Sequence, residues 1–252
     1  MSKAFDKLDI NRDLLLGLPF REGSGVETRD VSKLHRLLTL NDPGGGSFAW
    51  GNLATGIPYL QLAAVGGGPA DGVYLDCPAA DTGDLDFTTG DFSIGGWFNW
   101  DATGGWSEIL IGRYGVDLDG WEIYLDISGH LPIGNTLSQR HHHLSLAPST
   151  NSNCFSVGWT PGTWHFMGIS RSGGSLYPEH FREAIPLEMS YQAAGMLDPD
   201  TCNRDLVVGT RFTKDANWYR NMLWNLRIWG RALTREDWLF ILHTEGHWFG
   251  RN

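Results

Sequence analysis

The chain has 252 residues, of which 41% are hydrophobic and only 19% are charged. That apolar content can bury one sizeable core, and 33 glycines with so little charge exclude a disordered or coiled-coil protein. Acidic residues outnumber basic ones by 29 to 19, which gives a formal net charge of −10. Because nucleic-acid binding depends on clustered Lys and Arg side chains, this balance argues against a DNA- or RNA-binding function.

The cysteines and the N-terminal residues indicate where the chain folds. Cys77, Cys154 and Cys202 are widely spaced and odd in number, so they form no disulfide framework. A single disulfide bond between two of them remains an alternative. Reduced, buried thiols are the favoured interpretation. Residues 1–16 lack the pattern of a secretory signal, and no apolar stretch approaches ~18 residues. We therefore expect folding in a cytoplasm and no membrane insertion.

Most of the chain alternates apolar and polar residues with period two, which is typical of strands with one buried face. Gly- and Pro-rich turns separate these short segments, and this pattern favours a sandwich or jelly roll. The expected fold is all-β, a two-sheet antiparallel jelly-roll sandwich with one short C-terminal helix. The expected strands, in chain order, are Leu14–Phe20, Gly72–Asp76, 92–100, Glu108–Arg113, 121–127, His141–Ala147, Trp164–Ser170, Asp205–Gly209 and 222–229.

Three of these strands predict which side chains face the core. One face is expected to carry Trp121, Ile123, Leu125 and Ile127, and another to carry Phe92, Ile94, Phe98 and Trp100, with Trp97 on the opposite side. In the last strand, strict alternation places Met222, Trp224, Leu226 and Ile228 together and Leu223, Asn225, Arg227 and Trp229 on the other face.

One helix is predicted near the C-terminus. Thr234 and Asp237 form an acidic variant of the capping box, and Leu233 is positioned to contact Trp238 as a hydrophobic staple. The helix is expected to end near Gly246. We interpret residues 13–252 as one domain and residues 1–12 as a loosely attached arm.

Four motifs resemble those of laminin-G-like domains, a branch of the concanavalin A-like lectin-glucanase jelly rolls. Each motif is weak alone, but together they run in order through nearly the whole chain: Leu14–Gly25 followed by Asp30-Val31-Ser32, Asp91–Trp97, Thr163–Ile169 and Tyr219–Thr234. The resemblance implies two packed antiparallel sheets with a convex and a concave face. Members of the family bind glycans, proteins or calcium or serve as structural modules, including phage virion accessory proteins, so the fold does not assign a function.

Related glucanases use paired carboxylates on one strand, and the nearest counterpart here is Glu122 with Asp126. These residues share a strand face, but four residues correspond to ~13 Å along a strand, which exceeds the separation that glycoside hydrolysis requires. We interpret them as a solvated strand face and expect no enzyme activity.

Acidic loops resemble calcium sites in two places. Asp117 and Asp119 lie in the loop before a predicted strand, and laminin-G-like domains often bind calcium in that loop. The resemblance therefore implies, as a hypothesis, that these two residues bind a structural calcium ion. A second candidate set consists of Asp198, Asp200, Asn203 and Asp205. For either set the competing interpretation is a turn stabilised by Asp side chains.

The histidines and some tryptophans are the remaining candidates. On a strand, His141 and His143 point opposite to His142, so the three cannot converge on one metal ion, and exposed strand histidines are expected. Four of the twelve tryptophans lie beside loop residues, where an exposed ring could contact a glycan or a protein partner: Trp106, Trp159, Trp218 and Trp248.

Three functions follow from these patterns. The favoured one is a non-enzymatic structural or adhesive surface protein of a virion, either a capsid decoration or a tail- or fibre-associated protein. Its expected partners are a capsid or other virion protein, a host surface glycan and further copies of itself. The first alternative is a secreted, lectin-like carbohydrate-binding module with an extracellular location, and the less favoured one is a glycoside hydrolase.

Overall fold

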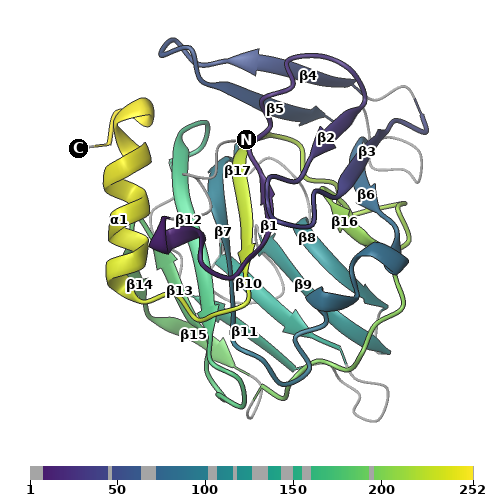
Figure 1. The fold of residues 1–252 in the computed structure, drawn as a ribbon, viewed down its shortest axis with the longest axis vertical. Coiled ribbons are helices and arrows are strands. Elements are labelled where there is room, and N and C mark those ends of the chain that lie inside the picture. Colours follow the sequence, from purple (N-terminus) through teal and green to yellow (C-terminus); the bar gives the residue numbers. More distant parts are fainter. Residues whose placement is uncertain are drawn as a thin grey trace.

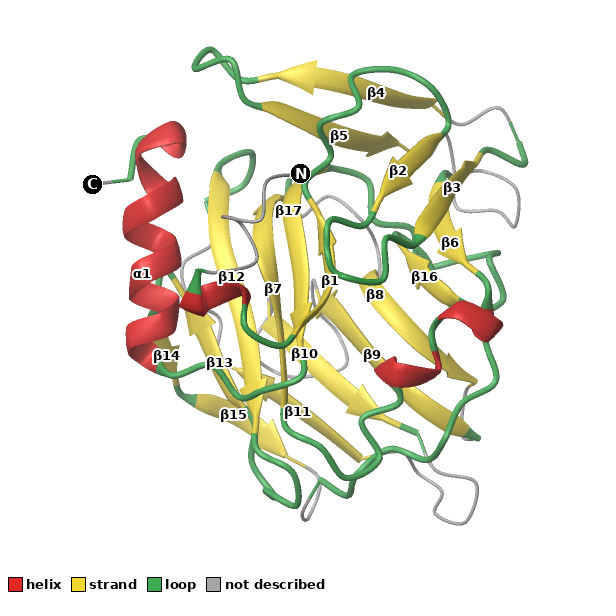
Figure 2. Ribbon diagram, viewed as in Figure 1, coloured by secondary structure: helices red, strands yellow, loops and turns green. Residues whose placement is uncertain are grey.

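Two antiparallel β-sheets pack face to face, and one α-helix lies against the outer face of the first sheet (Figures 1 and 2). This computed structural model describes residues 8–44, 47–63, 72–101, 107–115, 118–126, 136–142, 150–154, 160–192 and 196–251. The predicted all-β sandwich with a single short C-terminal helix is therefore confirmed. None of the helices in these ranges is long and apolar enough to cross a membrane.

The first sheet has eight strands in the order β14-β13-β12-β7-β17-β5-β4, and β1 also pairs with β17. Every pairing in it is antiparallel. Its strands are β1 (Leu14–Leu18), β4 (Ser47–Asn52), β5 (Pro58–Ala63), β7 (Phe92–Asn99), β12 (Trp164–Arg171), β13 (Glu179–Arg182), β14 (Ile185–Leu187) and β17 (Met222–Trp229).

The second sheet has nine strands in the order β15-β11-β10-β9-β8-β16-β6-β3-β2, again all antiparallel. The expected strand at His141–Ala147 is displaced, since β10 ends at His141 and residues 143–149 lie outside the described part. The strands are β2 (Glu27–Arg29), β3 (Leu37–Asn41), β6 (Tyr74–Cys77), β8 (Glu108–Gly115), β9 (Asp119–Asp126), β10 (Thr136–His141), β11 (Thr150–Cys154), β15 (Met189–Gln192) and β16 (Leu206–Val208).

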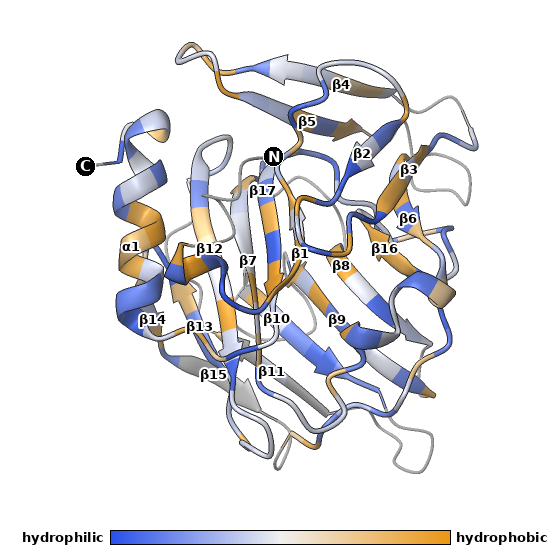
Figure 3. Cartoon of the chain, in the orientation of Figure 1, coloured by the Kyte–Doolittle hydropathy of each residue, from blue (hydrophilic) through white to orange (hydrophobic). Residues whose placement is uncertain are grey.

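The main core lies between the two sheets. Side chains of β7 and β9 enter it as the alternation predicts, and apolar and polar bands alternate along several strands in Figure 3. Trp97, on the other side of β7, belongs to a second apolar cluster on the outer face of the first sheet. The confirmed core residues are Phe92, Ile94, Phe98, Trp100, Trp121, Ile123 and Leu125.

A β-bulge in β17 overturns the predicted faces of that strand. The pairing of β17 with β7 is regular up to Trp224, shifts register, and resumes at Arg227, while Asn225 adopts a left-handed backbone with φ 51°. Because the extra residue reverses the alternation, Leu223 and Leu226 face the main core, whereas Trp224 and Arg227 share the outer face. Strict period two placed Trp224 with Leu226, and that prediction is wrong.

The helix α1 (Arg235–Glu245) covers part of this outer face. Its predicted capping box forms: Thr234 Oγ1 accepts a hydrogen bond from Asp237 N at 3.2 Å, and Thr234 N donates to Asp237 Oδ2 at 2.9 Å. Trp238 is fully buried, and its ring lies where any Cβ on Gly95 or Gly168 would clash, at 2.7 and 2.3 Å. Two glycines on neighbouring strands therefore let the helix approach the sheet.

Residues 8–12, the described part of the N-terminal arm, are not loosely attached. The short 3-10 helix η2 (Asp9–Asn11) buries Ile10 and Asn11, and Trp229 Nε1 donates to Ile10 O at 2.7 Å. Arg231 donates to the carbonyl oxygens of Asp9 and Arg12 as well. These contacts fix residues 9–12 beside α1, which corrects the expectation for that part of the arm; residues 1–7 lie outside the described residues.

The Asp30-Val31-Ser32 motif now has a physical explanation. The buried carboxylate of Asp30 accepts hydrogen bonds from Gly17 N at 2.8 Å, from Ser32 N at 2.7 Å and from Ser32 Oγ at 2.6 Å. Arg36 lies 3.4 Å from the same carboxylate and also donates to Leu15 O. The motif thus joins β1 to the segment before β3.

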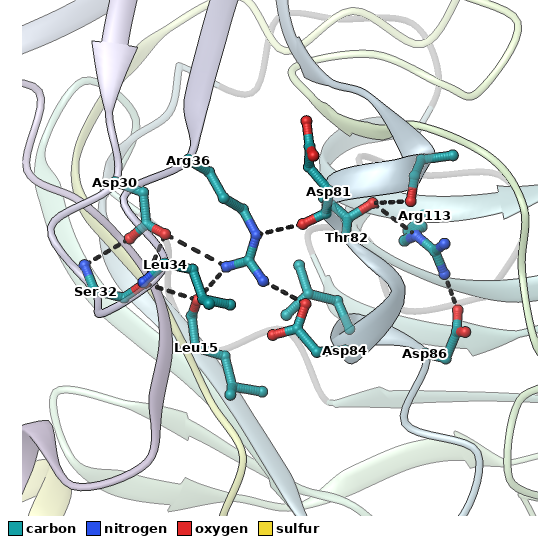
Figure 4. Close-up of polar contacts among 12 residues, drawn as sticks. Leu15, Asp30, Ser32, Leu34, Arg36, Asp81, Thr82, Asp84, Asp86 and Arg113 are labelled. Atoms are coloured by element: carbon teal, nitrogen blue, oxygen red, sulfur yellow. Dashed lines mark hydrogen bonds and ion pairs between the residues drawn. The ribbon is translucent and has the colours of Figure 1, made fainter.

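Arg36 continues into a larger network of ion pairs made by two buried arginines (Figure 4). Its Nε donates to Asp81 O at 2.7 Å, and its Nη2 pairs with Asp84. From the other side, Arg113 on β8 pairs with Asp86. The two arginines therefore hold the short 3-10 turns η3 (Ala79–Asp81) and η4 (Gly83–Leu85) against the sandwich.

Candidate functional site

A cavity of about 450 Å³ opens on the outer face of the first sheet, between α1, η2 and β17. This volume falls in the range typical of small-molecule sites. The bulge in β17 makes the cavity possible, since it turns Trp224 and Arg227 outward together. Its apolar lining includes Ile10, Trp224, Phe240, Ile241 and Trp248, and its polar lining includes Arg21, Asn225, Arg227 and Glu245.

Aromatic rings form one wall of the cavity. The Trp224 ring meets Trp248 edge-to-face, with centroids 5.4 Å apart and planes at 87°, and lies 5.4 Å from Phe249. Trp248 is half-buried, and Phe240 on α1 is 52% exposed. Such a mixture of fixed and accessible rings suits a ligand with an apolar face, such as a sugar ring.

Glu245, the last residue of α1, is the centre of a buried polar cluster in the same wall. Its carboxylate accepts hydrogen bonds from Trp97 Nε1 at 2.8 Å, from Asn225 Nδ2 at 2.8 Å and from Arg227 Nη2 at 3.0 Å. The Arg227 guanidinium balances this buried negative charge, and the two uncharged N–H groups add hydrogen bonds to the same carboxylate. Glu245 therefore ties the helix to the bulge rather than acting as a free carboxylate.

Two residues that line the cavity each contain a donor without a hydrogen-bond partner among the residues that the structure describes. Trp224 is 1% exposed and Arg227 is 6% exposed, yet neither Trp224 Nε1 nor Arg227 Nε makes a hydrogen bond with any described residue. Leaving such a group unpaired and dry costs about 1–3 kcal/mol. Both atoms are shielded from solvent, so they lie behind the cavity surface and are not available to a ligand in the cavity.

Of the two predicted tryptophans that the structure describes, Trp248 lines this cavity and Trp218 does not. Trp218 is 2% exposed and stacks on Tyr74 with centroids 6.2 Å apart, so its prediction as a contact residue is wrong. Its ring occupies the space that a Cβ on Gly72 would need, at 2.2 Å. Trp106 and Trp159 lie outside the described residues.

The carboxylates Glu122 and Asp126 are buried, not solvated as predicted. Glu122 Oε1 accepts from Arg140 Nη1 at 3.1 Å and lies 3.2 Å from His142 Nε2. Burial opposes the charge of Glu122, but the hydrogen bond with His142 and the Arg140 guanidinium hold its pKa below the ordinary value. A general acid needs a raised pKa, so Glu122 does not fit that role.

The histidine prediction was also wrong about exposure. His141 and His142 are both fully buried and, as predicted, use opposite faces of the sheet. His141 faces the main core, where its Nδ1 lies 2.7 Å from Leu197 O, whereas His142 stacks on Tyr114 with centroids 4.7 Å apart. His143 lies outside the described residues.

The donors required for calcium do not assemble among the described residues, which contain no cluster of three or more His, Cys, Asp or Glu side chains suited to a metal. Asp119 contacts the Cys202 thiol, with Sγ and Oδ1 3.4 Å apart, and Asp117 is outside the described part. In the second candidate set, Asp198 pairs with Arg171 and Asp205 pairs with Lys214.

Sequence reasoning missed Trp224, Arg227 and Phe240 as site residues. Trp224 was assigned to the wrong face because strict period-two alternation takes no account of a β-bulge. Phe240 could have been found, since it lies on the predicted helix away from the apolar stripe of Trp238 and Ile241.

No protein-family model matches the chain, and no curated protein matches it in sequence. Solved structures with a similar fold include the receptor-binding domain of the botulinum neurotoxin C/D mosaic serotype, with a TM-score of 0.68 and 10% identity over 96% of this chain and 55% of that one. The binding domain of botulinum neurotoxin DC in complex with rat synaptotagmin II has a TM-score of 0.66 and 12% identity, over 94% of this chain and 52% of that one.

A third structure comes from a study of botulinum neurotoxin type C, whose cell entry is described as dependent on interaction with two ganglioside molecules. It has a TM-score of 0.65 and 13% identity, over 94% of this chain and 52% of that one. The chain thus spans just over half the length of these neighbours. At such low identity the likeness establishes the β-sandwich fold and leaves function to the chain's own residues.

Proposed function

We propose that this protein is a non-enzymatic β-sandwich module that binds a glycan in the cavity between α1, η2 and β17. The observation that carries the proposal is the composition of that cavity, in which the accessible rings of Phe240 and Trp248 line the same space as the exposed donor groups of Arg21. Sugars present a C–H face to aromatic rings and hydroxyl oxygens to donors, so one ligand satisfies both kinds of group.

The structural neighbours support binding over catalysis. Several of them are described as binding domains; one description names an interaction with two ganglioside molecules, and another names a complex with SialylT. The lining supports it as well. Glycoside hydrolysis uses two carboxylates flanking the scissile bond, whereas Glu245 is the one carboxylate among the described lining residues and is occupied by three donors.

A glycan array tests the function directly. The wild-type protein and the Trp248→Ala variant would be compared, and we expect binding to a defined set of glycans that the variant loses by about tenfold or more. Tyr177→Ala is the matched control, because Tyr177 is 54% exposed and is not part of the cavity lining. Equal binding by both variants, or an array without signal, would contradict a glycan site at this position.

The setting that we propose is the surface of a virion, where the module would contact a capsid or tail protein and other copies of itself. The three cysteines support folding in a reducing compartment. All are buried as free thiols, and burial raises the pKa of each to about 11, which keeps them protonated and unreactive. Secretion as a lectin-like module is the alternative setting.

The setting is tested by quantitative mass spectrometry of purified particles from the organism that encodes the chain. A structural protein should appear in a fixed ratio to the major capsid protein through successive density gradients. Recovery of the protein only from the particle-free medium would favour the secreted module instead.

A further inference from the structure

We infer that β4, the last strand of the first sheet, is the contact through which two copies of this chain pair edge to edge, antiparallel, into one continuous sheet. The β4–β5 hairpin projects from the upper end of the sandwich with β4 on its outer side (Figure 1). An edge strand offers backbone N–H and C=O groups to which another strand can bond. The inference is independent of the proposed glycan site.

The register of the hairpin shows which backbone groups of β4 are open. Leu53 N donates to Ile57 O, and bonded pairs alternate with non-bonded pairs from there along the hairpin. Asn52 accordingly falls in a non-bonded pair with Pro58, which agrees with the missing N–H of proline. Every second residue of β4 therefore turns its backbone groups away from β5, and no described residue bonds to them. These residues are Phe48, Trp50 and Asn52.

The outward residues make β4 complementary to itself. They are spaced evenly about Trp50, so an antiparallel pairing centred there places Trp50 opposite its own copy and Phe48 opposite Asn52 of the partner subunit. Each such bonded pair exchanges two hydrogen bonds, so every outward N–H meets a C=O. A two-fold axis generates this contact from one surface, as in most homodimers.

The lack of charge in the hairpin favours a second copy as the occupant. From residue 43 to residue 70 the sequence contains no Asp, Glu, Lys, Arg or His, although 19% of the chain is charged. Two copies with a formal net charge of −10 each repel one another. Like charges directly opposite one another also destabilise paired strands. Pairing through this hairpin places no such charges opposite one another.

Two other terminal strands carry features that prevent pairing. β14, at the opposite end of the first sheet, contains Pro186, which has no N–H to offer to a further strand. β2, at one end of the second sheet, carries Glu27 and Arg29, both more than half exposed, and Glu22 Oε1 accepts from Arg29 N at 3.0 Å. β4 contains neither a proline nor a charge, so its edge is open by comparison.

The strand is fixed before it pairs. Phe48 and Trp50 are partly buried against the main core, and Trp50 Nε1 donates to Gly25 O at 3.0 Å. Ala49, on the opposite face, is exposed. Because the edge is held in its extended form, pairing orders little additional backbone and its entropic cost is small.

Sedimentation velocity across the micromolar range tests the inference. One strand pair is a small interface, so we expect a reversible dimer with a dissociation constant of roughly micromolar order. Ala49→Lys places a cation on the edge strand, as natural unpaired edges do, and should raise that constant by at least about tenfold. Asn52→Pro removes one outward N–H, leaves the bonds to β5 in place, and should act in the same direction.

Gln61→Lys is the matched control. Gln61 lies opposite Ala49 on β5, so the variant places the same charge on the same face of the sheet, one strand further from the edge. It should leave the dissociation constant within about twofold of wild type. Melting temperatures measured at low concentration, where the protein is monomeric, show that the variants are folded.

Hydrogen exchange of the wild-type protein identifies the edge without any substitution. The amides of Phe48, Trp50 and Asn52 should exchange more slowly as the protein concentration rises. Those of Ala49 and Gly51 bond to β5 at every concentration, so their exchange should not change and they provide the internal control.

Each contrary result has a distinct meaning. A monomer at every concentration would overturn the inference. A dimer whose affinity survives both Ala49→Lys and Asn52→Pro, or in which the outward amides exchange at a constant rate, would use another surface. Equal weakening by Gln61→Lys would place the contact on the face of the hairpin and contradict edge pairing. A silent glycan array would overturn the proposed function and leave these results untouched.

Discussion

Ser152 of β11 and His180 of β13 meet across the interior of the sandwich, with Ser152 Oγ 3.0 Å from His180 Nε2. Each residue belongs to a different sheet, and both are fully buried. No described residue pairs with His180 Nδ1, and burial lowers the pKa of His180 to about 3. The protein thus keeps a neutral imidazole in its core and links the two layers through it.

This histidine should make the fold sensitive to acid. The unfolded chain protonates His180 near pH 6.5 and the folded chain only near pH 3, so its contribution to stability is complete above about pH 6.5 and falls as the pH drops. The loss is at most about 1.4 kcal/mol per pH unit. Denaturant unfolding of wild type and His180→Leu between about pH 4 and pH 8 measures it, and the variant should show the shallower slope. Parallel curves would contradict the neutral buried state.

Glu108 should act in the opposite direction. Burial raises the pKa of this carboxyl to about 7 in the folded protein, although Arg220 N donates to its Oε2 at 3.3 Å. The folded state therefore holds a proton between about pH 4.5 and pH 7, and stability declines as the pH rises through that window. Glu108→Gln should lose this decline and gain up to roughly 3 kcal/mol relative to wild type by about pH 8.

The same unfolding series tests this prediction. Asp91→Asn is the control, because Asp91 is exposed and its carboxylate accepts a hydrogen bond from Gly173 N near the surface. A difference between Glu108→Gln and wild type that does not change with pH would show that Glu108 is ionised in the folded protein at neutral pH.

Asn225 should be replaceable by glycine but not by valine. Its left-handed backbone is accessible to glycine without strain, whereas a β-branched residue at φ 51° is strongly disfavoured. Both variants lose the hydrogen bond to Glu245, so the difference between them isolates the backbone. We expect Asn225→Val to be less stable than Asn225→Gly by about 1–3 kcal/mol in denaturant unfolding. Met222→Val, on the regular part of β17, should show no comparable cost.

Arg36 should be among the most sensitive charged residues. It is almost completely buried and pairs with Asp30 and Asp84, so Arg36→Leu leaves two carboxylates without their guanidinium. Breaking a buried ion pair from one side costs about 3–5 kcal/mol. Arg29→Leu is the matched control, since Arg29 and Glu27 are both more than half exposed and 4.0 Å apart, and should change stability by less than about 0.5 kcal/mol. Equal melting temperatures for the two variants would contradict the role of this network.

Local patterns could be predicted from the sequence where one short segment contains its own cause. The cap of α1 depends on Thr234 and Asp237, three residues apart, and it forms as expected. Regular alternation in β7 and β9 predicts which of their side chains enter the main core, and that prediction is confirmed. The candidate site could not be predicted in the same way, because it combines η2, β17 and α1, and residues 10 and 241 become neighbours only through the fold.

What the amino-acid sequence determined by itself was the architecture, because period-two alternation, turn residues and a capped helix each act over a few neighbouring positions. Whether the side chains on the outward faces of the strands are buried was decided by the tertiary structure alone. Glu122, His142 and Trp97 lie on the sides turned away from the main core, yet all are buried. A pattern shows which side of a strand faces the core but not what covers the other side. The cavity has the same origin: one left-handed residue, Asn225, reversed the alternation and placed Trp224 beside Arg227, a shift set by pairing with β7 that no spacing rule reveals.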